Sequence, residues 1–132
     1  MVVDASAMAE VCLASPAAPQ VRERIAVEDA VAPDLIDAEV FAVLALRGRR
    51  GELTSDQVSA AVEVLLAAPI QRVPSGRMLR RAQSLTGALS GYDALYAALA
   101  QSLDCLLMTC DARFAGTATA QLRLSVLHIP VG

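Results

Sequence analysis

Short apolar segments alternate with longer helical segments along the whole of this chain. Four of the apolar segments, Val2–Val3, Ile70–Val73, Cys105–Thr109 and Ser125–Ile129, are too short for helices and indicate buried strands. Strands that alternate with helices pair in parallel through right-handed crossover connections. The sequence therefore predicts an α/β/α sandwich, a three-layer fold with a central, mainly parallel sheet.

Helix start and stop signals divide the remaining chain into helical segments. Ser6 is expected to cap the first helix, and Thr54, followed three residues later by Gln57, resembles a capping box. Proline and glycine residues separate the segments. The third helix is expected to bury a face that includes Glu39, Val43 and Leu46. The predicted helices cover approximately residues 7–14, 20–28, 34–46, 54–68, 75–85 and 91–103.

The length of 132 residues predicts one domain, covering residues 1–132. Hydrophobic residues make up 55% of the chain, yet no uninterrupted apolar stretch approaches the ~18 residues that indicate a membrane span. The N-terminus lacks a basic segment followed by an apolar one, so we expect no secretory signal and a cytoplasmic protein. The excess of apolar residues must be buried in the core or covered by a partner.

Four acidic residues stand where predicted strands end or within apolar helices: Asp4, Glu39, Asp93 and Asp111. Ligand sites of parallel α/β sheets form at the carboxyl ends of the strands, where Asp4 and Asp111 are expected. Carboxylates that cluster away from water repel one another, and a cation compensates for that cost. Oxygen ligands of this kind favour Mg²⁺ or Mn²⁺.

Each of these acids also has a purely structural interpretation. Asp4 and Asp111 are typical of the turns that follow strands. Asp93 lies three residues after Ser90 and completes a capping box of its own helix. Helical periodicity does not distinguish Glu39 from Asp37, which also has apolar neighbours on its face of the helix.

Other chemistries have less support in the sequence. Cys12, Cys105 and Cys110 are too few and too widely spaced for a disulfide framework or a CxxC-type zinc site, and we expect them to pack as small apolar residues. The one histidine, His128, lies in an apolar run. All basic residues are Arg, so the Lys typical of receiver domains and aspartate-nucleophile phosphatases is missing. The net charge of −3 would become about +1 with two divalent cations, which leaves RNA possible as a partner.

Four pieces of the chain, in order, resemble motifs of the PIN-domain nucleases, most closely the toxin of VapBC-type toxin–antitoxin pairs. The first is the strand and hydroxyl of Val2–Ser6, and the second is the Pro-x-Leu-x-x-x-Glu-like helix of Pro33–Glu39. The third is the acid-bearing helix of Ser90–Ala100, and the fourth is the Thr-x-Asp-x-Arg-Phe turn that ends Cys105–Phe114.

The resemblance implies a PIN-like fold and a Mg²⁺- or Mn²⁺-dependent endoribonuclease with an antitoxin partner and a homodimeric state. It selects Glu39 over Asp37 and implies that structured RNA such as tRNA is cut by metal-activated water. The implied site comprises the catalytic metal ligands Asp4, Glu39, Asp93 and Asp111, the supporting hydroxyls Ser6 and Thr109, and the phosphate contact Arg113. Two alternatives remain, a housekeeping PIN nuclease of RNA maturation and a non-catalytic PIN-like module that binds RNA or protein.

Overall fold

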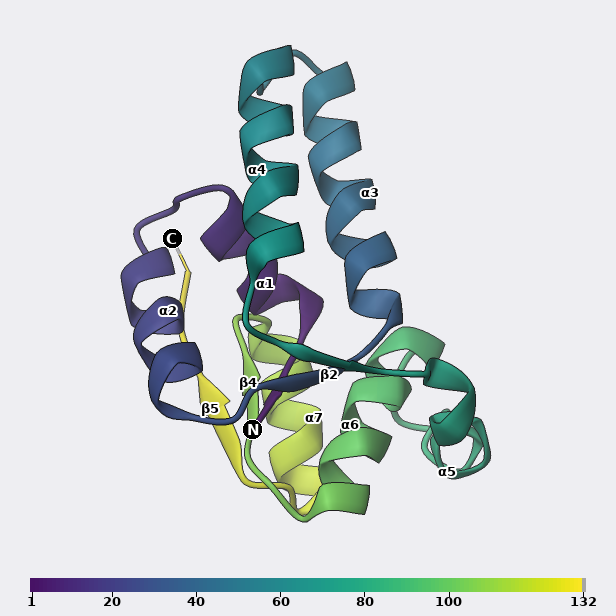
Figure 1. Ribbon diagram of the computed structural model, residues 1–132. Coiled ribbons are helices and arrows are strands. Elements are labelled where there is room, and N and C mark those ends of the chain that lie inside the picture. The colour runs from purple at the N-terminus through teal and green to yellow at the C-terminus, as the bar shows by residue number, and fades with distance from the viewer. Residues whose placement is uncertain (132) are drawn as a thin grey trace.

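A single parallel sheet organises the computed structural model, which describes residues 1–131 (Figure 1). The strand order is β3-β2-β1-β4-β5, and every neighbouring pair is parallel. The predicted α/β/α sandwich is therefore confirmed. Its strands are β1 (Val2–Val3), β2 (Val31–Pro33), β3 (Gln71–Val73), β4 (Leu107–Thr109) and β5 (Val126–His128).

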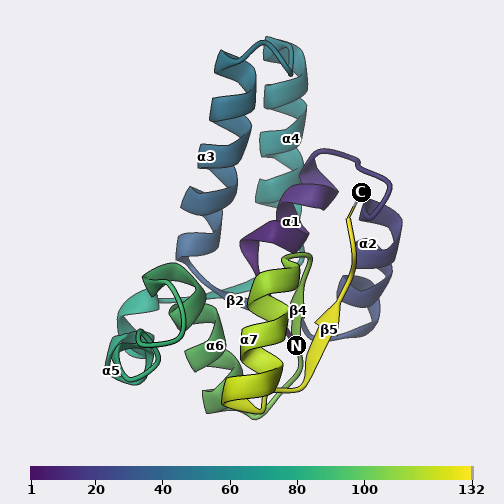
Figure 2. The same cartoon turned by 180° about the vertical axis from the view of Figure 1, so that it is seen from behind.

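Helices cover both faces of the sheet. The connections from β1 to β2 and from β2 to β3 run in one direction across the sheet and place α1 to α4 on one face. The connections from β3 to β4 and from β4 to β5 run in the opposite direction and place α5 to α7 on the other face. Helices α3 and α4 form an antiparallel pair that projects beyond the sheet, and α6 and α7 come forward when the molecule is turned (Figure 1 and Figure 2). The helices are α1 (Ala5–Cys12), α2 (Ala18–Val27), α3 (Leu35–Arg49), α4 (Ser55–Ala67), the 3₁₀ turn η1 (Ser75–Met78), α5 (Leu79–Gln83), α6 (Gly91–Leu103) and α7 (Ala112–Leu122).

The core lies around the two central strands. Val2, Val3, Leu107 and Met108 are fully buried, as expected for strands covered by helices on both faces. The same hydrophobic cluster extends from Met1 to Ile129, so both ends of the chain contribute to it. Because β1 and β4 are held rigidly at the centre, the residues that follow them occupy fixed positions at one edge of the sheet.

Several predicted elements differ from the structure. Strand β2 was missed because Val31–Pro33 is short and ends in a proline, which indicated a helix start instead. Helix α7 was also missed, since Gly116 and the two nearby threonines lower its helix propensity. The segment 75–85, predicted as one helix, is a 3₁₀ turn followed by the short α5.

Helix α3 buries a different stripe from the predicted one. Ile36, Val40 and Leu44 are fully buried, whereas Val43 and Leu46 are more than one-third exposed. The prediction was wrong here because α3 packs against α1 and α4 rather than flat on the sheet. Asp37 and Glu39 consequently flank the buried stripe on either side.

Other expectations agree with the structure. Thr54 and Gln57 form the predicted capping box of α4. All three cysteines are free thiols, with Cys12 and Cys110 buried. Among residues 1–131, none of the helices combines the length and the apolarity that a membrane span requires.

Candidate functional site

The parallel sheet brings acidic residues from distant parts of the chain to one edge. Asp4 directly follows β1, and Asp111 lies two residues after the neighbouring strand β4. Glu39 lies in the second turn of α3, which follows β2 along the chain, and Asp93 lies in the first turn of α6. The carboxyl ends of parallel strands are the usual place for a ligand site in this class of fold.

Asp4 is the most constrained of the four acids. Its side chain is almost fully buried and caps α1, where Oδ1 accepts a hydrogen bond from the Ala7 backbone N–H at 3.0 Å. The Ser6 hydroxyl donates to the same oxygen at 2.7 Å, and the Thr109 hydroxyl donates to Oδ2. The prediction that Ser6 caps α1 was therefore wrong, because Asp4 occupies the cap.

The hydroxyls of Ser6 and Thr109 join the ends of β1 and β4. Their oxygens lie 3.1 Å apart, and both contact the Asp4 carboxylate. The Cys110 N–H donates to Ser6 Oγ at 2.9 Å, and the Asp111 N–H donates to Thr109 Oγ1 at 3.0 Å. The network holds the backbone that leads to Asp111 close to the Asp4 carboxylate.

Glu39 and Asp37 have different partners, although periodicity alone did not separate them. The Tyr96 hydroxyl donates to Glu39 Oε1 at 2.9 Å, whereas Asp37 accepts hydrogen bonds from the Arg72 guanidinium. Burial raises the pKa of Glu39, and the neighbouring charges of Asp93 and Asp4 raise it further. Glu39 therefore faces the acidic edge, and Asp37 has a structural ion pair.

Asp93 and Asp111 line one cavity of about 300 Å³ together with the exposed Arg113. Ser90 accepts a hydrogen bond from the Asp93 N–H at 3.2 Å, as its capping role requires. Asp111 caps α7 by accepting from the N–H groups of Arg113 and Phe114 at 2.9 and 3.0 Å. The predicted capping box is only half formed, because the Asp93 carboxylate accepts no hydrogen bond from the Ser90 N–H. Asp111 does cap its helix, and both residues border the cavity.

The four carboxylates influence one another through space. Burial raises the pKa of Asp4 to about 6, with a further contribution from Asp93. Burial and then the charge of Asp111 raise the pKa of Asp93. Within residues 1–131, no arginine side chain forms an ion pair with any of these four carboxylates. The site therefore concentrates negative charge, and Arg113, which borders the cavity, is not paired with any of the four.

Hard oxygen donors of this kind fit Mg²⁺ or Mn²⁺. As the side chains lie, however, no three acidic, histidine or cysteine side chains in the described part of the chain form a ready ligand set. The Asp4 and Asp111 carboxylates are instead directed to hydroxyl and backbone N–H donors. Direct coordination by several of the acids would thus require side-chain rotation, and coordination through water would require less.

Comparison with known proteins identifies the family. The sequence matches the family model described as PIN domain over residues 1–120. The chain belongs to the PIN-domain family. Its relatives include VapC ribonuclease Mb0985 of Mycobacterium bovis, 33% identical over 127 residues, which are 96% of this chain and 98% of the relative.

Two further relatives of this PIN domain come from Mycobacterium tuberculosis. Ribonuclease VapC3 is 39% identical over 116 residues, which cover 87% of this chain and 85% of the relative. Ribonuclease VapC12 is 36% identical over 116 residues, which cover 87% of this chain and 89% of the relative. The resemblance to VapC-type PIN domains is therefore confirmed.

Sequence reasoning missed Tyr96 as a residue of the site. It is 1% exposed and lies three residues after Asp93, so both side chains are on the same face of α6. Burial and the charge of Glu39 raise the pKa of Tyr96, which keeps the phenol protonated as a hydrogen-bond donor. The spacing of three residues from an acidic position was the signal that could have revealed it.

We expect Tyr96→Phe to weaken Mn²⁺ binding by about 10-fold, because Glu39 loses the donor that orients its carboxylate. The phenyl ring remains and should preserve the core packing. Isothermal titration calorimetry with Mn²⁺ measures the change. Tyr92→Phe is the control, since Tyr92 is 63% exposed on the same helix. Equal Mn²⁺ affinity of Tyr96→Phe and wild type would refute an orienting role.

The buried Asp4 predicts a specific pH dependence of stability in EDTA. Its pKa of about 6 in the folded protein exceeds the ordinary value of 3.8, so the folded state holds this proton more tightly. The free energy of unfolding therefore decreases as the pH rises from about 4 to about 6 and beyond, by roughly 3 kcal/mol from this group.

Asp4→Asn removes this titration while retaining a side chain of the same shape. Urea denaturation between about pH 4 and about pH 7 should show a falling stability in wild type relative to the variant. If the difference between the two proteins stays constant with pH, Asp4 does not titrate in this way.

Proposed function

We propose that this PIN domain, acting as a single domain over residues 1–132, is a Mg²⁺- or Mn²⁺-dependent endoribonuclease and the toxin of a toxin–antitoxin pair. The cluster of four carboxylates, none of which forms an ion pair with an arginine of the described residues, is the observation that carries the proposal. The relatives, which are named VapC ribonucleases, support the RNA substrate and the toxin role.

In this proposal, Asp4, Glu39, Asp93 and Asp111 hold one or two divalent ions, directly or through water. A bound ion of this kind lowers the pKa of a water molecule and offsets charge on phosphoryl oxygens. Hydrolysis of an RNA phosphodiester would leave a 5′-phosphate and a 3′-hydroxyl, and structured RNAs such as tRNA are the proposed targets.

Other residues have supporting roles in the proposal. Ser6 and Thr109 orient the Asp4 carboxylate through the hydrogen bonds described above. Arg113 borders the cavity beside Asp111 and is the proposed contact to a substrate phosphate. Tyr96 orients Glu39. These protein groups position the reacting atoms and do not form a covalent intermediate.

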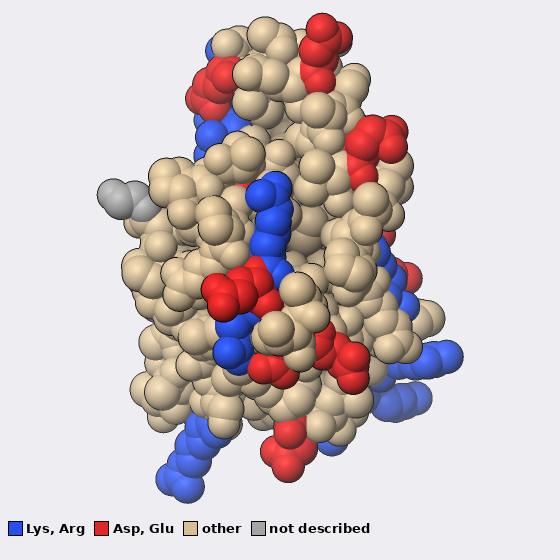
Figure 3. All heavy atoms as spheres, turned by 60° about the vertical axis from the view of Figure 1, so that its left-hand side comes forward, with Lys and Arg blue, Asp and Glu red and all other residues tan. Residues whose placement is uncertain are grey.

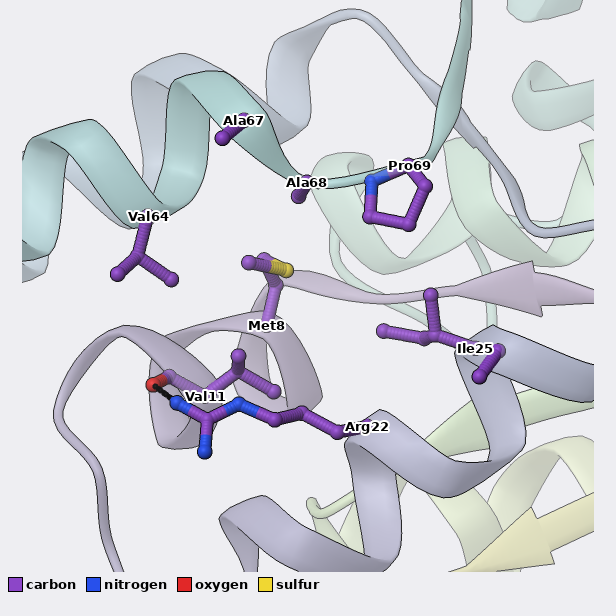
Figure 4. A pocket seen from close by; sticks show the side chains of 9 residues that line it. Met8, Val11, Arg22, Ile25, Val64, Ala67, Ala68 and Pro69 are labelled. Carbon is purple, nitrogen blue, oxygen red and sulfur yellow. Dashed lines mark hydrogen bonds between the residues drawn. The ribbon is translucent and has the colours of Figure 1, made fainter.

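An apolar groove supports the proposed antitoxin partner. Met8, Val11, Ile25 and Val64 point towards one another from α1, α2 and α4 and line a cavity of about 390 Å³ (Figure 4). Arg22 crosses its edge and donates to the Val11 carbonyl oxygen. The face that includes α2 is largely uncharged, with acidic and basic groups intermingled near its centre (Figure 3). An apolar segment of the antitoxin would bury this groove.

Exposed apolar side chains on α3 support the proposed homodimer. Phe41 is 52% exposed, and Val43 and Leu46 are also partly open to solvent. Val43 and Leu46, three residues apart, lie on one face of α3, and Phe41 lies on another. Apolar groups that are exposed on a surface gain stability when a second chain covers them. The proposed RNA substrate and antitoxin are cytoplasmic molecules, so the proposal includes a cytoplasmic location.

The enzymatic proposal predicts metal-dependent cleavage of RNA that EDTA abolishes. Asp93→Asn and Glu39→Gln should lower the cleavage rate at least about 100-fold, because each removes a negative oxygen from the ion-binding cluster. Denaturing gels of labelled RNA measure the rate. Asp56→Asn is the matched control, since Asp56 is exposed in the first turn of α4. Folded variants that cut as fast as wild type would contradict the assignment.

The antitoxin proposal predicts that Val64→Asp weakens binding of the protein encoded by the neighbouring gene by about 100-fold, because a charge would enter an apolar interface. Leu66→Asp is the control, since Leu66 lies on the same helix but is 67% exposed outside the groove. Surface plasmon resonance measures both affinities. Growth arrest on expression, relieved by the neighbouring gene, distinguishes a toxin from a housekeeping nuclease.

A further inference from the structure

One stretch of the chain is unusually rich in positive charge. From Val64 to Tyr92 there are four arginines and no acidic residue, although acids outnumber bases in the whole chain. The stretch contains η1 and α5 and leads directly into α6, which carries Asp93. The stretch therefore ends next to Asp93, whereas Arg77 borders a cavity together with Ser102 and Leu103 at the other end of α6.

The four arginines of this stretch fall into two groups. The Arg72 guanidinium is used internally, because it donates to the Leu65, Ala68 and Ile70 carbonyl oxygens and to Asp37. Arg77, Arg80 and Arg81 are exposed and form no side-chain hydrogen bond or ion pair with the described residues. Their charges are available to an external partner.

The segment that carries these three arginines is fixed in place at both ends. At its start, Asp34 Oδ1 accepts from the Ser75 hydroxyl at 2.6 Å and from the Ser75 N–H at 3.0 Å, and Ser75 Oγ accepts from the Leu35 N–H. At its end, Leu89 and Ser90 line the cavity that Asp93 and Asp111 border.

The segment consequently bridges the two helices that present acids to the site. Ser75 is bonded to the first turn of α3, which carries Glu39, and Ser90 caps α6, which carries Asp93. In between, Met78 and Ala82 are buried and α5 packs against α6, as both ribbon views show (Figure 1 and Figure 2). The arginines thus project from an anchored platform rather than from a free loop.

A polyanionic substrate needs positive charge outside an acidic site. The four carboxylates repel the phosphates of RNA, and Arg113 is the one basic residue among those that line the cavity of Asp93 and Asp111. The guanidinium group can donate two parallel hydrogen bonds to a phosphate. An exposed arginine loses no internal hydrogen bond and little hydration energy when it binds a phosphate. The unpaired positive charges closest along the chain to Asp93 are those of η1 and α5.

We propose that residues 75–90 form an RNA-binding surface in which Arg77, Arg80 and Arg81 contact backbone phosphates of nucleotides outside the acidic cavity. The proposal rests on the proposed ribonuclease function and names the surface that holds its substrate. Contacts to phosphates give affinity and position without base specificity, so this surface serves many RNA sequences.

The test compares two triple variants with equal loss of charge. Arg77→Gln/Arg80→Gln/Arg81→Gln removes the proposed surface, and Arg47→Gln/Arg49→Gln/Arg50→Gln removes the exposed cluster at the junction of α3 and α4. Binding of a fluorescein-labelled single-stranded RNA of mixed sequence is measured by anisotropy in EDTA, so that no cleavage occurs. Circular dichroism melting checks that both variants are folded.

We expect the Arg77/Arg80/Arg81 triple variant, the α5 variant, to bind RNA at least about 10-fold more weakly than wild type. The slope of log K against the logarithm of the salt concentration should become shallower by about 0.7 for each lost phosphate contact. The RNA affinity of the control variant should differ from that of wild type by less than about threefold. In Mg²⁺, the α5 variant should raise KM for RNA cleavage with little effect on kcat, because the acidic cluster is intact.

Equal weakening by both triple variants would overturn the proposal, since only net charge would then matter, and so would unchanged binding by the α5 variant. Weaker antitoxin binding with unchanged RNA binding would also overturn it and assign the surface to the protein partner. If wild type binds RNA at this surface but does not cut it in Mg²⁺, the ribonuclease proposal fails while the binding surface stands.

Discussion

The burial of the Asp4 carboxylate at the end of β1 is the interaction on which the architecture of the site depends. Two hydroxyls and one backbone N–H donate to it, and these groups come from α1 and from the end of β4. The same hydroxyls accept from the backbone that leads to Asp111. Since a buried carboxylate is tolerated only when its oxygens are hydrogen-bonded, this network ties the two central strands together at the acidic edge.

Different contacts distinguish the structural acid Asp37 from Glu39, which belongs to the candidate site. Arg72 ties Asp37 to the end of α4, which leaves Glu39 to accept from Tyr96 and to face Asp4 and Asp93. Other parts of the described surface include an apolar groove formed by α1, α2 and α4 and a basic segment in η1 and α5. The proposed antitoxin and RNA therefore have chemically distinct surfaces on one small domain.

Much of the fold was predictable because strand and helix signals are local. Val2–Val3 and the Thr54 capping box are examples. The four family motifs predicted the family, which the comparison with known proteins confirms. The failures have tertiary causes. Val31–Pro33 is a strand because β1 and β3 pair with it, and α7 forms because Asp111 caps it and Phe114 is buried against the core. The buried stripe of α3 follows from its packing against α1 and α4.

The sequence by itself determined the class of fold and the family and predicted the four acidic positions, because apolar periodicity and motif order are properties of the chain. Only the tertiary structure decided how these acids are partnered. It paired Glu39 with Tyr96, gave Asp37 to Arg72, made Asp4 the cap of α1 and left the arginines of η1 and α5 unpaired. These outcomes depend on which helix faces pack together, and contacts between residues distant in sequence fix that arrangement.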